Sequence, residues 1–258
     1  MNKELLQQVK DKVRSSEYVH SMFNIFDDLD RDLTKAICTD EYVITSSEAA
    51  NDMFVIVFDS VTDTQRLAND VKCLMDECKV KIVYLNDIAK RYLSLYINST
   101  YKVLVAETCF TMKLEPTVRC IEKPMIVPEH MIDKIINNVI GKMEIDFNSQ
   151  LYEYIIETLV SRVLNNEYFY IGGDDIILTQ LFVKEFDNCA YVGGVLTREE
   201  YRGNGLAQEL LSRVISKYAN KNMTMYLNVS TNNECAIHMY KKLGFKECGL
   251  MYSFTIMS

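Results

Sequence analysis

The sequence predicts a mixed α/β (α+β) fold, with a second α/β domain at the N-terminus. Segments with strand-like and helix-like periodicity alternate along the chain. All three prolines lie in one short stretch, Pro116 to Pro128, and all nine glycines follow it, from Gly141 to Gly249. At 258 residues the chain is long enough for two modest domains.

The part of the chain before the prolines, residues 1–114, is expected to be an auxiliary α/β domain. Residues 1–35 have apolar side chains at helical spacing. The pattern then predicts a strand at 53–58, a helix at 64–77, a strand at 80–85, a helix at 86–97 and a strand at 101–113. Residues 115–128 are expected to be an interdomain linker. Because no glycine precedes it, the first domain cannot hold a glycine phosphate loop.

Residues 129–258 are expected to form the second domain. It should begin with helices at 129–143 and 148–165. An antiparallel meander of strands should follow, at 168–171, 176–186 and 190–197. The pattern then predicts a helix at 205–220, a strand at 223–229, a helix at 233–243 and further strands up to residue 254.

Two glycines, Gly203 and Gly205, lie between a predicted strand and a predicted helix. Glycine permits positive φ and close approach of a ligand, and the first turn of a helix presents free N–H groups. A strand, a glycine loop and a helix N-terminus together predict a phosphate site. A dinucleotide loop would need a third glycine where Gln208 stands, and the sequence has no G-K-[ST] motif for a P-loop.

Two blocks of sequence carry a resemblance to a known family. The loop Arg202-Gly-Asn-Gly-Leu-Ala207 matches [R/Q]-x-x-G-x-[G/A], the coenzyme A signature of the GNAT (Gcn5-related) acetyltransferases. A second GNAT segment, N-x-x-A-x-x-x-Y-x-x-x-G-F, is matched downstream by Asn233, Ala236, Tyr240, Gly244 and Phe245. The part of the chain after Pro128 therefore resembles a GNAT domain, whose mixed and mostly antiparallel sheet is flanked by helices.

The resemblance implies that acetyl-CoA is the cosubstrate and lies between strands 190–197 and 223–229. Its pantetheine arm would pair with the backbone of Val195, Leu196 and Thr197. Its pyrophosphate would lie on the N–H groups of Gly203, Asn204, Gly205, Leu206, Ala207 and Gln208. Arg202 would hold the loop or contact the phosphates, and Asn233 would bond the pantetheine or cap its own helix.

The resemblance also implies that the acetyl group passes to a primary amine of a small molecule or a protein. Tyr240 would be the general acid for the leaving thiolate, because a phenol of pKa about 10 is protonated at neutral pH. A buried core position is the alternative for Tyr240. Some relatives use a glutamate as base where this sequence has Asn228, which cannot accept a proton. A water chain or an acidic residue on the acceptor side would then act as base.

A non-catalytic acyl-CoA-binding or sensing protein is the alternative function. Asn228 favours this alternative, because it removes the base that some relatives use. Tyr240 opposes it, because the acid of the family is retained.

The order of elements in the first domain resembles that in the second. Asn86 and Ala89 repeat the spacing of Asn233 and Ala236, but Leu93 stands where the second domain has Tyr240. We therefore expect a degenerate GNAT-like repeat that has the same fold and lacks a coenzyme site. An unrelated α/β domain is the alternative.

Composition limits the partners. The net charge of −8 and the lack of a basic cluster argue against nucleic acid. No apolar run reaches the length of a membrane span, and the N-terminus lacks a signal region, so a cytoplasmic protein is expected. The eight cysteines and three histidines show no metal-ligand spacing, so no metal is expected. Monomer and homodimer both remain open.

Overall fold

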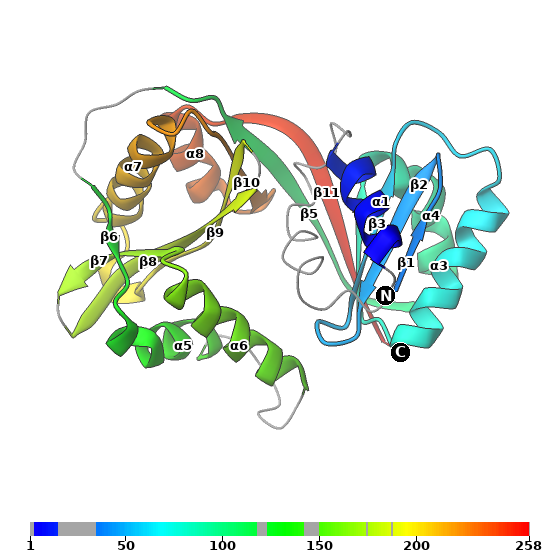
Figure 1. The fold of residues 1–258 in the computed structure, drawn as a ribbon, viewed down its shortest axis with the longest axis horizontal. Helices are drawn as coiled ribbons and strands as arrows, with labels where there is room; N and C mark the ends of the chain where they lie inside the picture. The colour runs from blue at the N-terminus through cyan, green and yellow to red at the C-terminus, as the bar shows by residue number, and fades with distance from the viewer. Residues whose placement is uncertain are drawn as a thin grey trace. The chain divides into compact units, whose positions relative to one another are not determined.

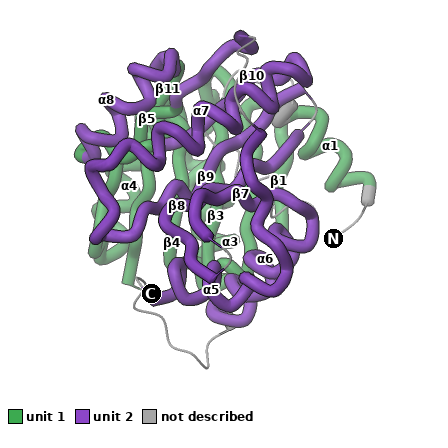
Figure 2. The backbone as a smooth tube through the Cα atoms, turned by 90° about the vertical axis from the view of Figure 1, so that its left-hand side faces the viewer, with its two compact units in different colours: residues 1–111, 229–232, 248–258 green, residues 112–228, 233–247 purple. Residues whose placement is uncertain are grey.

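The computed structural model describes residues 3–14, 35–117, 123–141, 150–173, 175–186 and 188–257. The chain divides into two compact units, which are drawn in Figures 1 and 2. Unit 1 comprises Met1–Thr111, Val229–Asn232 and Cys248–Ser258, and unit 2 comprises Met112–Asn228 and Asn233–Glu247. The C-terminal strand of the chain therefore belongs mainly to unit 1, although it follows unit 2 in the sequence.

Unit 1 contains a sheet with the strand order β1-β2-β3-β4-β11-β5. Strands β3 and β4 are parallel, whereas β1–β2, β2–β3 and β4–β11 are antiparallel pairs. The elements are α1 (Lys3–Arg14), β1 (Lys35–Cys38), β2 (Tyr42–Ser47), β3 (Asp52–Val57), α3 (Thr64–Cys78), β4 (Ile82–Asn86), α4 (Asp87–Thr100), β5 (Lys102–Leu114) and β11 (Lys246–Met257).

Helices α3 and α4 build the core of unit 1 against β2, β3 and β4. The inner face of α3 carries buried apolar side chains at helical spacing, among them Leu67, Val71 and Leu74. Burying this face removes apolar surface from water, which is the main force that holds the helix on the sheet.

The predicted strands and helices between residues 53 and 113 are confirmed to within a few residues. Strands β1 and β2 were missed. Every residue of β2 is buried, so the strand lacks the alternation of apolar and polar residues by which a half-buried strand is recognised. Of the predicted helix at 1–35, residues 15–34 lie outside the described residues, and Lys35 begins β1.

Unit 2 contains a sheet with the strand order β10-β9-β8-β7-β6. The pairs β6–β7, β7–β8 and β8–β9 are antiparallel, and β9–β10 is parallel. In Figure 1, α5 and α6 lie on one side of this sheet, and α7 and α8 lie on the other. The elements are β6 (Met125–Ile126), the 3-10 helix η2 (Glu129–Met131), α5 (Ile132–Ile140), α6 (Gln150–Leu164), β7 (Tyr168–Gly173), β8 (Ile176–Phe186), β9 (Cys189–Thr197), the 3-10 helix η3 (Glu199–Tyr201), α7 (Leu206–Ala219), β10 (Thr224–Ser230) and α8 (Glu234–Leu243).

The predicted fold class is confirmed, since unit 2 has a mixed and mostly antiparallel sheet flanked by helices. The boundaries of the compact units differ from the domain limits expected from sequence. Met125 and Ile126 lie in the stretch expected as a linker, yet they form β6 and pair with β7. Residues 248–257, expected in the second domain, group with unit 1.

Candidate functional site

Strands β9 and β10 of unit 2 pair over only part of their length. Their parallel pairing runs from Cys189 opposite Thr224 to Val192 opposite Leu227. β9 then continues through residues 193–197, and in this described stretch it forms no ladder with β10. The backbone groups on that edge of β9 can therefore pair with an extended ligand.

Two glycines produce a bulge where β9 leaves β10. The register between β8 and β9 shifts between Gln180, which faces Leu196, and Phe182, which faces Gly193. Gly194 has φ of +59°, which L side chains rarely adopt. A Cβ atom on Gly193 would lie 2.3 Å from the ring of Phe182. Both glycines are therefore needed for this bulge, and the sequence analysis gave neither of them a role.

The loop after β9 leads into the N-terminus of α7. Gly203 and Gly205 have φ of +78° and +76°, a conformation that favours glycine at both positions. Gly205 is the N-cap of α7, and it supplies no side-chain hydrogen bond to the first turn. The N–H groups of that turn are thus left to a ligand or water, at the positive end of the helix dipole.

A cavity of about 650 Å³ lies at this helix N-terminus. The predicted residues that line it are Thr197, Arg202, Gly203, Gly205, Leu206, Ala207 and Gln208. Five further residues that were not predicted also line it: Tyr201, Glu234, Cys235, His238 and Met239. Four of these lie on α8 at spacings that share one helix face, so the helical periodicity of the α8 sequence could have indicated them.

The remaining predicted residues lie outside the lining of this cavity. Asn204 holds the loop, because its side-chain N–H donates to the carbonyl of Tyr201 at 3.2 Å. Asn233 caps α8, since its Oδ1 accepts from the N–H of Ala236 at 3.2 Å. Val195 and Leu196 lie on the stretch of β9 that does not pair with β10.

Arg202 is bonded to the end of β9. Its Nε donates to the carbonyl of Thr197 at 3.3 Å, and its Nη1 lies 4.0 Å from Glu199 Oε1. The first contact fixes the loop between β9 and α7. The second is exposed and long, so it leaves the guanidinium free to contact an anion in the cavity.

Tyr240 is buried on the inner face of α8, where its ring lies edge-on to Phe245 with centroids 6.0 Å apart. Burial raises the pKa of the Tyr240 phenol to about 12, because the charged phenolate is poorly solvated there. The side chain is therefore protonated at neutral pH. Tyr240 and the cavity lining lie on different faces of α8, and the packing of this ring agrees with the core position that the sequence left open.

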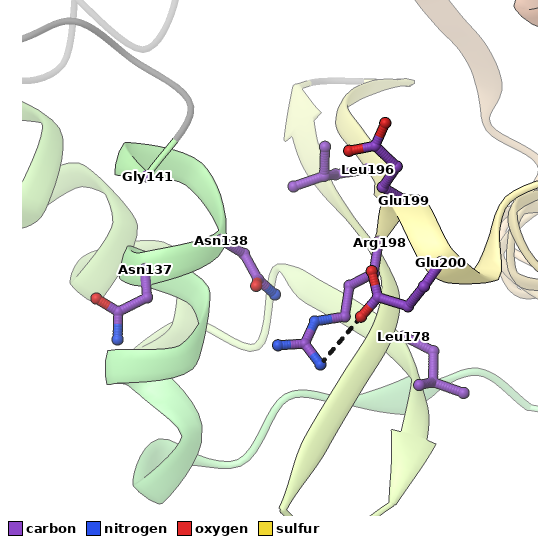
Figure 3. A pocket seen from close by; sticks show the side chains of 8 residues that line it. All are labelled: Asn137, Asn138, Gly141, Leu178, Leu196, Arg198, Glu199 and Glu200. Atoms are coloured by element: carbon purple, nitrogen blue, oxygen red, sulfur yellow. Dashed lines mark ion pairs between the residues drawn. The ribbon is translucent and has the colours of Figure 1, made fainter.

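A second cavity, of about 270 Å³, lies between α5 and the end of β9 (Figure 3). Its lining comes from the end of α5, from β8 and β9, and from the start of η3, and it consists of Asn137, Asn138, Gly141, Leu178, Leu196, Arg198, Glu199 and Glu200. Arg198 Nη1 lies 3.8 Å from Glu200 Oε1. Leu196 and Arg198 line this cavity, whereas Thr197 between them lines the first one, as expected when successive side chains of a strand point to opposite faces.

Two negative observations concern only the described residues. Within that part of the chain, no group of three or more His, Cys, Asp or Glu side chains could hold a metal ion. The described helices also include none that is both long and apolar enough to cross a membrane.

Comparison with known proteins gives a consistent result. The sequence model of the acetyltransferase (GNAT) family matches residues 137–245. No curated protein matches the chain.

Solved structures share the fold at low sequence identity. A GCN5-related N-acetyltransferase from Sphaerobacter thermophilus is 15% identical, with a TM-score of 0.61, over 84% of this chain and 78% of that one. One from Kribbella flavida is 13% identical, with a TM-score of 0.60, over 91% and 93%. A tandem GNAT protein from the clavulanic acid biosynthesis pathway is 10% identical, with a TM-score of 0.52, over 84% and 79%.

The sequence match and the fold agree with the geometry of unit 2. The family match spans β9, the glycine loop, α7, β10 and α8. These elements contain the unpaired end of β9 and the lining of the first cavity. The chain therefore carries a domain of the GNAT acetyltransferase family at residues 137–245.

Proposed function

We propose that this protein is an N-acetyltransferase that moves the acetyl group of acetyl-CoA to a primary amine. One observation carries the proposal: the N-terminus of α7, free of a side-chain cap, opens on a cavity of about 650 Å³ beside the separated end of β9. This arrangement offers backbone donors for a pyrophosphate and a strand edge for an extended arm in one place.

The donor would be held mainly by backbone groups. The N–H groups from Gly203 to Gln208 would bind the pyrophosphate, with the helix dipole contributing about 0.3–1 kcal/mol per charge at an exposed terminus. Arg202 would add a cation while it keeps its bond to Thr197. The backbone of Val195, Leu196 and Thr197 would pair with the pantetheine arm. In this scheme Asn233 positions α8 by capping it.

The chemistry then requires the movement of two protons. The amine nitrogen attacks the thioester carbonyl carbon, the new C–N bond forms, and the C–S bond breaks. The amine loses a proton to water or to a carboxylate on the acceptor side, since Asn228 cannot take it. Tyr240 would give a proton to the leaving thiolate, for which its raised pKa keeps the phenol protonated.

A non-catalytic acyl-CoA-binding protein is the second candidate, and Asn228 is the observation that favours it. Release of free thiol from acetyl-CoA, measured across a panel of small amines and amine-bearing peptides, separates the two functions. Amine-dependent release supports the transferase. Coenzyme binding by calorimetry without release for any amine in the panel supports the sensor.

A further inference from the structure

The two cavities of unit 2 meet at the end of one strand. Thr197 lines the first cavity, and its neighbours Leu196 and Arg198 line the second. The backbone between them belongs to the part of β9 that does not pair with β10. A group bound along this backbone would therefore be reachable from both cavities, as the transfer between two substrates requires.

Gln180, whose side-chain amide is buried, contacts two residues that line the second cavity. Gln180 is 1% exposed and pairs in register with Leu196 at the bulge. Its Oε1 accepts a hydrogen bond from Nδ2 of Asn138 at 3.0 Å, which leaves Oδ1 of Asn138 available to a ligand. The Nε2 of Gln180 is buried and has no partner among the described residues. Buried polar groups without partners are uncommon and costly, so one beside a cavity indicates a functional role.

The guanidinium of Arg198 lies on the side of the second cavity that faces Asn138. Figure 3 shows the side chains of Arg198 and Asn138 directed toward each other across the cavity. The contact of Arg198 with Glu200 is 3.8 Å long, beyond a hydrogen bond, and both side chains are substantially exposed. Arg198 can therefore exchange this partner for a carboxylate, which a guanidinium binds through two parallel hydrogen bonds.

We propose that the second cavity binds the acceptor, and that the acceptor is a small primary amine that also carries a carboxylate. The inference rests on the proposed transferase function. The volume of the second cavity, about 270 Å³, is slightly below the usual range of ligand pockets and suits a molecule of amino-acid size. Arg198 binds the carboxylate, while Asn138 and the carboxylates of Glu199 and Glu200 receive the amine. Gln180 is a positioning residue that orients the amide of Asn138.

The test uses the full chain with acetyl-CoA and matched pairs of acceptors. Each pair contains an α- or ω-amino acid and the amine of the same structure that lacks the carboxylate, such as 4-aminobutyrate and propylamine. We expect kcat/KM for the amino acid to exceed that for its partner by at least tenfold in some pairs. Arg198→Gln should reduce this ratio to near one without a change in coenzyme affinity. Arg91→Gln, which breaks an exposed ion pair with Asp87 in unit 1, should preserve it.

A second pair of variants tests the positioning role of Gln180. Gln180→Met removes the amide and should raise the KM of the acceptor about tenfold while coenzyme affinity holds. Gln180→Glu keeps an oxygen that can accept from Asn138, so it should recover most of that loss. A purely structural role would lower the melting temperature of both variants and would leave the KM of the folded protein unchanged.

The outcomes separate this inference from the proposed function. Equal kcat/KM within every pair, acetylation of neither member of any pair while coenzyme binds, or an unchanged ratio in Arg198→Gln would overturn the inference and leave the donor site standing. Failure of the wild-type chain to bind acetyl-CoA by calorimetry would instead overturn the proposed function.

Discussion

The same connection occurs in both units, but its crossover helix begins with a side-chain cap in unit 1 and without one in unit 2. In unit 1 the parallel strands β3 and β4 are joined by α3 and followed by α4. In unit 2 the parallel strands β9 and β10 are joined by α7 and followed by α8. Asn86 caps α4 through Ala89 in the way that Asn233 caps α8 through Ala236.

The crossover helices begin differently. In unit 1 the N-cap of α3 is Asp63, whose Oδ1 accepts from the N–H of Arg66 at 2.9 Å. In unit 2 the N-cap of α7 is Gly205, which offers no side chain. A carboxylate already occupies the end of α3 where an anion would otherwise bind, whereas the end of α7 remains available.

The parallel strands also end differently. In unit 1, Asn86 is fully buried and bridges to the end of β3: its Nδ2 donates to the carbonyl of Val57 at 2.8 Å, and its Oδ1 accepts from the N–H of Val57 at 3.2 Å. In unit 2, β9 runs on through residues 193–197 without pairing to β10. In unit 1 the side chain of Asn86 thus bonds the backbone at the end of β3. In unit 2 the corresponding end of β9, beyond the bulge, does not pair with β10.

We infer from this comparison that unit 1 is a GNAT-like repeat whose donor site has been replaced by internal hydrogen bonds. The shared element order and the matching asparagine caps support the inference. It predicts that changes which make unit 2 resemble unit 1 remove function, whereas the closing contacts of unit 1 contribute stability.

The largest effect is expected for Tyr240→Phe, since the corresponding position of unit 1 holds Leu93. If Tyr240 is the acid, turnover should fall by roughly 10² to 10⁴-fold with coenzyme affinity unchanged, because the hydroxyl acts in the transition state. Steady-state kinetics of thiol release with a confirmed acceptor would measure this. A loss smaller than about tenfold, with chemistry rate-limiting, would assign Tyr240 to the core.

The two capping asparagines should differ in their contribution to stability. Asn86→Ala should destabilise the chain by about 3 kcal/mol, because it removes three buried hydrogen bonds of about 1 kcal/mol each. Asn233→Ala should cost only about 1 kcal/mol, because that side chain is exposed and serves as a cap. Urea unfolding of the full chain measures both values. Equal losses would show that Asn86 does not close the edge of β3.

Gly205→Asp places in unit 2 the cap that α3 has in unit 1. It should weaken coenzyme binding at least tenfold, or about 1.4 kcal/mol, since it adds a negative charge where the pyrophosphate approaches. Gly205→Asn is the matched control, because it has the same shape, tolerates positive φ and carries no charge. Affinities that fall equally in both variants would attribute the effect to the backbone rather than to charge.

The smallest effect is expected for Asp63→Ala in unit 1. Loss of this N-cap should cost about 1 kcal/mol of stability, and it should leave coenzyme affinity and stoichiometry unchanged. A second equivalent of bound coenzyme in calorimetry of this variant would show that the carboxylate alone had been blocking a complete site.

The sequence predicted the glycine loop between β9 and α7 well and its surroundings less well. Gly203 and Gly205, followed by apolar residues at helical spacing, located the helix N-terminus in the sequence, and both have positive φ in the structure. The bulge at Gly193 and Gly194 depends on the position of the Phe182 ring, a contact between distant parts of the chain that a local pattern does not contain.

Three further features were beyond local patterns. Strand β2 was missed because its polar residues are buried along with its apolar ones, so its sequence does not alternate between apolar and polar positions. The second cavity combines α5, β8 and the end of β9, so its lining follows from sheet order and not from spacing in the sequence. The bridge from Asn86 to Val57 was likewise missed, although the capping role of an asparagine at this spacing was visible.

We propose that the donor binds at α7 of unit 2 and that unit 1 has no donor site. Hydrogen–deuterium exchange of the full chain, with and without coenzyme A, tests this most directly. Coenzyme A should slow exchange of the amides at residues 193–208 and 233–239. It should leave exchange at residues 57–66 unchanged, because Asp63 and Asn86 already bond the backbone there. Protection at residues 57–66, or its absence at residues 203–208, would contradict it.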